Sequence, residues 1–211
     1  STTLYNALLL SGVEIKEVHK HTLPVFYVPL ALDAMVSEYT SDLRFVNTTE
    51  NPMYIHTYSD KNSVTVDIYG TDRALEENQY ALHAVYGGGN QASYNGTPIV
   101  TVHNCDNSIE YVYGGGNAAA VEATNVTIWG GNVIGNVFGG GHGYKDGAGA
   151  DVEGDVNLAI KGGTIKRVFG GSNSKGNISG TINLDINKDG ACDMRIGEVY
   201  GGGNEADGNA G

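Results

Sequence analysis

Cysteine, proline, tryptophan and basic residues are scarce in this sequence of 211 residues. Two cysteines are too few for a disulfide scaffold, and no apolar run approaches the roughly 20 residues of a membrane span. Twelve Lys and Arg residues against 24 Asp and Glu give a formal net charge of -12. Because this charge repels a phosphate backbone, we expect no nucleic acid partner.

Glycine, by contrast, is abundant, with 32 residues against four prolines. No Gly-X-Y period is present, which excludes a collagen-like chain. Regular alternation of apolar residues between the glycine clusters argues against disorder. The composition therefore predicts a folded repeat that places glycine at fixed corners.

A nine-residue motif, Ile-x-x-Val-Tyr/Phe-Gly-Gly-Gly-Asn, occurs five times with small variations. The copies cover residues 82–90, 109–117, 134–142, 165–173 and 196–204. The motif valines are Val85, Val112, Val137, Val168 and Val199, so the spacings are 27, 25, 31 and 31 residues. Self-similarity at such a period is typical of solenoids and propellers.

A second repeated element precedes each glycine motif and alternates like a strand. Its copies are residues 64–68, 98–102, 124–128, 156–160 and 182–186. The first, third and fifth positions are mostly aliphatic and face one way, whereas the polar positions between them face the other. Two aliphatic residues three apart in Ile-x-x-Val require a bulge or corner to face the same way. Short strands at this period, without helices, predict an all-β, right-handed parallel β-helix of about five coils.

The repeat covers residues 53–211, whereas residues 1–52 do not carry it. A solenoid needs its first layer covered, so the N-terminal segment is either a cap or part of a separate flanking domain. The sequence ends at Gly211, where earlier copies would enter the next strand. An uncapped C-terminal coil exposes a strand edge, so we expect either a longer native chain or a partner, including end-to-end self-association.

The repeats from residue 64 to residue 211 resemble the glycine-rich repeats of large, mostly uncharacterised surface β-helix proteins of gut Bacteroidetes and related anaerobes. That resemblance implies a secreted or cell-surface location and an adhesin-like role. It carries no catalytic signature.

Two classes of function follow. The first is a noncatalytic surface module that binds a glycan or a surface protein along the outer strand face. Its candidate binding residues are Thr65, Asp67, Thr101, Thr127, Asn157 and Asp185. The second is a polysaccharide lyase or glycoside hydrolase, because fold alone does not decide function.

Spacing disfavours the enzyme. Asp67 and Asp185, the acids in matching outward positions, lie four coils apart, about 19 Å at ~4.8 Å per coil. Paired glycosidase carboxylates need roughly 5–10 Å. Lys166 and Arg167 with Glu198 are the nearest match to a lyase site, and an ion pair between coils explains them equally well.

The last residues of the motif predict two ladders along the stack. An amide ladder would join Asn90, Asn117, Asn173 and Asn204, with His142 as a substitute for asparagine. A stack of aromatic rings would join Tyr86, Tyr113, Phe138, Phe169 and Tyr200. If that stack faces outward, it could pack against sugar rings.

We expect no cofactor, and calcium is the cation that the sequence can accommodate. Asp185, Asn187, Asp189 and Asp193 match part of a calcium loop, but the twelfth position is Ile196, which favours an ordinary turn. Weaker candidates are His19 with His21, and the acidic loop of Asp146, Asp151, Glu153 and Asp155. Cys105 and Cys192 follow strands three coils apart, about 14 Å along the axis, so we expect two free thiols.

Overall fold

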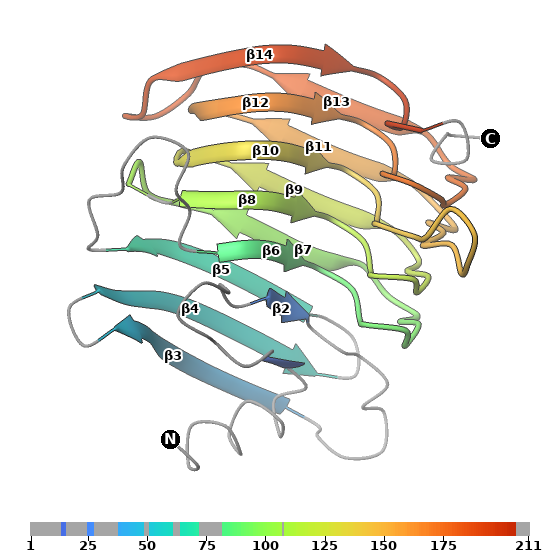
Figure 1. The fold of residues 1–211 in the computed structure, drawn as a ribbon, viewed down its shortest axis with the longest axis horizontal. Coiled ribbons are helices and arrows are strands. Elements are labelled where there is room, and N and C mark those ends of the chain that lie inside the picture. The colour runs from blue at the N-terminus through green and yellow to red at the C-terminus, as the bar shows by residue number, and fades with distance from the viewer. Residues whose placement is uncertain are drawn as a thin grey trace.

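The computed structural model describes residues 14–15, 25–27, 38–48, 51–60, 64–71, 82–106 and 108–205, with side chains for 65–68, 83–106 and 108–205. These residues form strands, turns and bends, and the strands alternate between two sheets (Figure 1). The fold is the predicted all-β solenoid, a parallel β-helix of about five coils.

Sheet A has the order β1-β2-β6-β8-β10-β12-β14. Its strands are β1 (Glu14–Ile15), β2 (Val25–Tyr27), β6 (Leu82–Tyr86), β8 (Ser108–Tyr113), β10 (Asn132–Phe138), β12 (Gly163–Phe169) and β14 (Met194–Tyr200). Sheet B has the order β13-β11-β9-β7-β5-β4-β3. Its strands are β3 (Glu38–Thr48), β4 (Asn51–Asp60), β5 (Val64–Thr71), β7 (Pro98–Val102), β9 (Thr124–Ile128), β11 (Val156–Ile160) and β13 (Ile182–Ile186).

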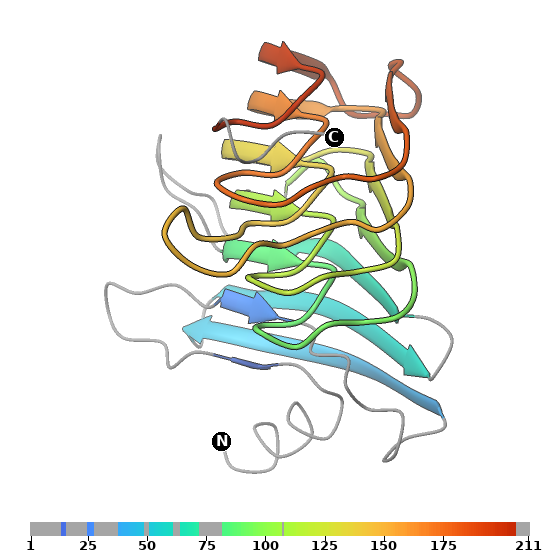
Figure 2. The same ribbon diagram turned by 90° about the vertical axis from the view of Figure 1, so that its right-hand side faces the viewer.

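Each coil contains one strand of each sheet, and a short third side leads from one coil to the next. We number the coils 1 to 5 from the pair β5 and β6 to the pair β13 and β14. The third side consists of single parallel bridges that join Tyr94, Val121, Val152 and Ile178 along the stack. In Figure 1 the strands of the near sheet run to the right as the chain climbs, which is the sense of a right-handed coil, and Figure 2 shows the turns that close each coil.

The strands β5, β7, β9, β11 and β13 pair in parallel without a register shift. Buried and more exposed positions alternate along them, as the sequence predicts. Val100, Val126 and Leu158 occupy the central inward position and are at most 1% exposed. They face the aliphatic residues of sheet A, so the core is a continuous column of Val, Ile and Leu between the two sheets.

The corner predicted within Ile-x-x-Val is present, because Ile109 and Val112 are both buried. In one copy of the motif, however, the prediction that Ile134 is the first inward residue was wrong. In coil 3 the strand β10 carries an extra residue, and Val133 rather than Ile134 pairs with Ile109. The bulge moves Ile134 to a half-buried position and leaves Val133 in the core.

The first glycine of each motif is required by close approach between coils. A Cβ atom on Gly87, Gly114, Gly139 or Gly170 would lie closer than 3.0 Å to the carbonyl oxygen of the equivalent glycine in the next coil. Positive φ values occur elsewhere, for example at Gly131, in the short turn before β10, and at Gly163, the first residue of β12. The glycine corners therefore set how tightly the coils stack.

The predicted aromatic stack is present. Successive rings from Tyr86 through Tyr113, Phe138 and Phe169 to Tyr200 have centroids 4.6, 5.0, 5.0 and 4.9 Å apart, with interplanar angles of 3° to 11°. The first four rings are at most 4% exposed, and only Tyr200 on the last coil is open, at 45%. The stack is thus a second core. Because its first four rings are buried, they are not accessible to sugar rings.

The prediction of two free thiols was wrong. Cys105 and Cys192 form a disulfide with a Cα–Cα distance of 5.4 Å. The segment between β13 and β14 folds back along the stack: the backbone amide of Asp189 donates to Lys161 O of coil 4, and Gly190 approaches Trp129 of coil 3. Cys192 thereby reaches coil 2, so the assumption that each loop stays within its own coil fails here.

Candidate functional site

The outer face of sheet B carries two rows of side chains in register. One row is Thr65, Ile99, Asn125, Asn157 and Asn183, and the other is Asp67, Thr101, Thr127, Ala159 and Asp185. The six predicted binding residues all lie in these rows. Asn125 and Asn183 complete the exposed amides of the first row.

A shallow groove of about 200 Å³ runs over this face at the strands β9, β11 and β13. Its lining combines the polar side chains of Asn125, Asn157, Asn183 and Asp185 with the apolar Val126, Leu158 and Ala159. Within the groove, Asn183 Nδ2 donates to Asn157 Oδ1 at 3.1 Å, whereas the remaining amide groups face solvent. Because parallel strands fix the spacing along each row, the groove offers amide donors and acceptors at a regular interval.

The two aspartates at the ends of the second row are held by cationic or imidazole partners. Asp67 Oδ1 lies 2.7 Å from His103 Nε2, and Asp185 Oδ2 lies 2.6 Å from Lys161 Nζ. Sequence reasoning missed both partners. His103 and Lys161 each directly follow a sheet B strand, and this shared position was the signal that could have revealed them.

The carboxylates considered for an enzyme are not brought together. Asp67 on β5 and Asp185 on β13 are separated by the three intervening strands β7, β9 and β11. On sheet A, Arg167 Nε donates to Glu198 Oε2 at 3.2 Å, which is the ion pair expected between adjacent coils. Tyr200 OH also donates to Glu198 Oε2.

The contacts of Glu198 shift two ionisation equilibria. The hydrogen bond from Tyr200, followed by that from Arg167, lowers the pKa of Glu198 below 4.5. The same hydrogen bond, followed by the negative charge of Glu198, raises the pKa of Tyr200 above 10.0. Farther along sheet A, burial and the charge of Glu110 raise the pKa of Tyr111. The lowered pKa keeps the Glu198 carboxyl ionised, whereas a general acid needs a raised carboxyl pKa.

Three candidate calcium residues, Asn187, Asp189 and Asp193, lie on the segment that folds back toward Cys105, and the fourth, Asp185, lies on β13. The backbone amide of Asn187 donates to Ile160 O, and Asp193 O accepts from the amide of Gly163. Among the described side chains, no group of three or more His, Cys, Asp or Glu residues is arranged to hold a metal ion. His19 and His21 lie outside the described residues.

The acidic loop uses its carboxylates to bind the next coil. Asp151 Oδ1 accepts from the backbone amide of Asn177 at 2.8 Å, and Asp155 Oδ1 accepts from that of Thr181 at 2.7 Å. These two acids therefore stabilise the third side of the coils.

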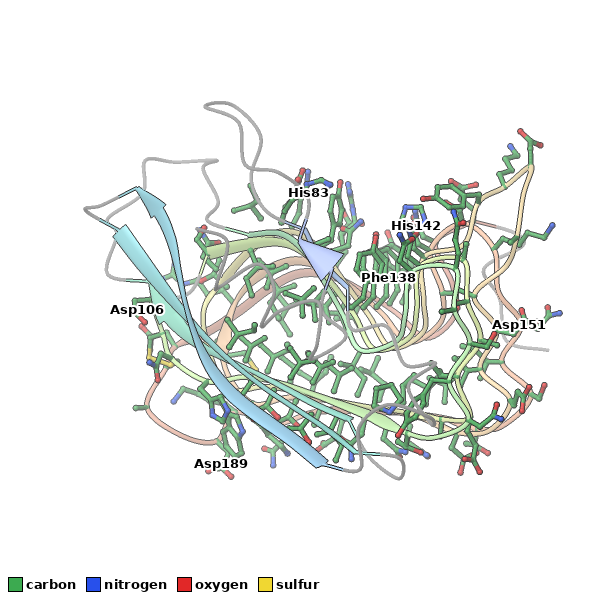
Figure 3. All side chains as sticks on the ribbon, turned by 90° about the horizontal axis from the view of Figure 1, so that it is seen from below. His83, Asp106, Phe138, His142, Asp151 and Asp189 are labelled. Carbon is green, nitrogen blue, oxygen red and sulfur yellow. A yellow bond between two sulfur atoms is a disulfide. The ribbon has the colours of Figure 1, made fainter. Side chains whose placement is uncertain are left out.

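The amide ladder is interrupted at His142. Asn117 Nδ2 donates to Asn90 Oδ1, and Asn204 Nδ2 donates to Asn173 Oδ1, each at 2.9 Å. Between these pairs, the ring of His142, which is labelled in Figure 3, packs near Tyr113 and Tyr144, with centroids 5.4 and 5.2 Å away. Its Nδ1 lies against the carbonyl oxygen of Gly143. His142 thus replaces the amide by a ring that packs on its neighbours.

The family match concerns the N-terminal part of the chain. Residues 1–69 match a family model described as VanW like protein, and this match ends within β5, before the glycine motifs. A stretch of 72 residues, 34% of the chain, is 36% identical to the uncharacterized protein YoaR of Bacillus subtilis strain 168. It covers 24% of that relative. No solved structure shows a significant match, and the described residues contain no helix with the length and hydrophobicity of a membrane crossing.

Proposed function

We propose that the chain is a noncatalytic binding module of a secreted or cell-surface bacterial protein, adhesin-like, which binds a glycan along the outer face of sheet B. The observation that carries this proposal is the groove over β9, β11 and β13, with its row of amides in register. Amides that face solvent at a regular spacing can donate to and accept from the hydroxyl groups of successive sugar units.

A glycan fits this face better than a protein does. Protein interfaces are anchored by aromatic and large apolar side chains. Among the described side chains of the outer face of sheet B, Ile99 is the single large apolar residue that is exposed. The exposed amides along the shallow groove support contacts with hydroxyl groups instead.

The disulfide supports the location outside the cytoplasm. Disulfides form and persist in oxidising compartments and are rare among cytosolic proteins. The Cys105–Cys192 bond joins coils 2 and 5, so it is part of the folded architecture. A secreted or surface location provides both the oxidising environment and access to glycans.

A glycan array followed by calorimetry tests the proposal. We expect one class of neutral glycan to bind, and Asn125→Ala to weaken its binding about 3- to 10-fold, the value of one or two lost hydrogen bonds. Ser179→Ala, an exposed polar substitution on the third side of the coils, is the matched control and should bind like the parent protein. Affinity for a protein ligand alone, or an unchanged affinity for Asn125→Ala, would contradict glycan binding at this face. Depolymerisation of a bound glycan would contradict the noncatalytic role.

A further inference from the structure

Sheet A carries a depression larger than the groove of sheet B, at the beginnings of the strands β10, β12 and β14. It has a volume of about 500 Å³ and is lined by residues 132–134 of β10, 164–166 of β12 and 195–197 of β14. The outward side chains include Asn132, Thr164, Lys166 and Arg195, all exposed, and Gly197 adds no side chain. The depression is within the volume range of ligand sites, roughly 300–1,000 Å³.

Two cations line this depression without a partner. The side chains of Lys166 and Arg195 make no hydrogen bond or ion pair in the described part of the chain. Other basic residues are engaged: Lys161 pairs with Asp185, and Arg167 pairs with Glu198. Lys166 and Arg195 are therefore two positive charges, on adjacent strands, that are free to meet an anion.

Glu198, an acid on the same sheet, already has two hydrogen-bond donors. Glu198 accepts from Arg167 and Tyr200, although the positive charge of Lys166 also helps to lower its pKa. With Lys166, Arg167 and Arg195 against Glu198, this part of sheet A is positive on a chain of net charge -12. Such local reversal of sign focuses anionic ligands on the depression.

The net charge also limits what kind of anion fits. Nucleic acids carry one charge about every 1.7 Å of duplex, and the remaining surface of this acidic chain would repel so dense a polyanion. A glycan with one carboxylate per sugar unit can place one or two carboxylates on Lys166 and Arg195. Its hydroxyl groups then meet the polar side chains of Asn132 and Thr164.

From these observations we infer that the depression formed by β10, β12 and β14 is a second binding site, which takes the carboxylate groups of an acidic polysaccharide. The site lies on the sheet opposite the groove of sheet B. It does not depend on the function proposed for that groove.

Oligogalacturonate, with its carboxyl-reduced neutral counterpart as the paired ligand, provides the probe. Calorimetry on the full chain is expected to show binding of the acidic oligosaccharide at 50 mM NaCl, weakened severalfold at 300 mM because salt screens exposed charges. The neutral counterpart should bind at least 10-fold more weakly. Lys166→Gln with Arg195→Gln should lower the affinity for the acidic oligosaccharide at least 10-fold, since hydrogen bonds to charged groups are the stronger class.

Lys145→Gln is the matched control, because Lys145 is also exposed but lies on the loop before β11. It removes one positive charge and should leave the affinity within twofold of the parent value. Asn125→Ala should likewise leave it unchanged, which separates this site from the groove of sheet B. Absence of binding, equal binding of the neutral counterpart, an unchanged double variant whose circular dichroism matches the parent, or tighter binding of duplex DNA would each overturn the inference.

Discussion

Cys192 occupies the space that a side chain at residue 130 would need. A Cβ atom on Gly130 would lie closer than 3.0 Å to Cys192 Sγ and 3.0 Å from Asn104 O. A Cβ atom on Gly162, in the next coil, would lie 3.2 Å from Cys192 Cβ. The segment after β13 therefore passes close to both turns on its way to Cys105, and the disulfide is visible as the pair of sulfur atoms near Asp106 in Figure 3.

Gly130→Ala should therefore prevent closure of the disulfide. The new methyl group would overlap Cys192 Sγ and the backbone at Asn104, which has little room to move. We expect two free thiols per chain in a thiol assay under denaturing conditions, against none in the parent. Gly201→Ala is the control because a Cβ there has no neighbour within 4 Å, and it should keep the disulfide.

Reduction of the disulfide should lower the free energy of unfolding by about 4 to 5 kcal/mol, given a separation of 87 residues between the cysteines. Urea unfolding with and without reductant measures the change. Because Trp129 is the one tryptophan of the chain and lies beside Gly190, its fluorescence should also report release of the segment. The Cys105→Ser, Cys192→Ser variant should not respond to reductant. Equal unfolding midpoints for the oxidised and reduced parent would refute the prediction.

The first glycine of the motif should tolerate a side chain in the last coil but not in the coils before it. Gly139→Ala places a methyl group against Gly170 O and should destabilise the fold by about 3 kcal/mol, at the upper end of overpacking costs. Gly201→Ala occupies the same motif position in coil 5, where space is open, and should stay within about 0.5 kcal/mol of the parent. Denaturant unfolding of both variants measures the difference. Similar losses for the two would show that the close approach between coils is not the cause.

The contact between Glu198 and Tyr200 should appear in pH titrations. Since the folded pKa of Glu198 lies below 4.5, the stability that its contacts contribute is complete above the unfolded value and is lost as the pH falls through the folded pKa. The folded pKa of Tyr200 lies above the unfolded value of 10.0. The stability that the Tyr200 hydrogen bond contributes is therefore fully present below pH 10.0 and is lost as the pH rises through the folded pKa.

Carbon NMR of labelled tyrosine rings can follow the second equilibrium directly. Glu198→Gln removes the charged acceptor and should move the pKa of Tyr200 down toward 10.0. Glu153→Gln, an exposed acid on the third side of the coils, should leave it where it is. If the Tyr200 titration is the same in the parent and in Glu198→Gln, the hydrogen bond does not control that proton.

Millimolar calcium should leave the melting temperature unchanged. A cation that binds only the folded state would raise it. However, Lys161 Nζ lies 2.6 Å from Asp185 Oδ2, where calcium would need the carboxylate. Differential scanning calorimetry with calcium or with chelator measures the effect. A rise that Asp189→Ala abolishes would establish a calcium site on this segment.

The sequence predicted what repeats. Alternation along the sheet B strands gave the inward residues Val100, Val126 and Leu158, and the motif gave the aromatic stack around Phe138. These features depend on local conformation repeated at a fixed period, so one copy determines the next. The same register places Thr127 and Asn157 on the outer face of sheet B, and the candidate binding rows could therefore be predicted.

Only the tertiary structure decided what does not repeat. The loop lengths differ between coils, and the path of a loop depends on the space that its neighbours leave; for this reason the Cys105–Cys192 bond could not be read from the strand spacing. The extra residue in β10 likewise required pairing across strands to place Val133 in the core. Ion pairing is a third feature that only the tertiary structure decided, because whether Lys161 and Arg195 have partners depends on side chains from other coils. The depression beside Arg195 likewise forms only when three strands lie together.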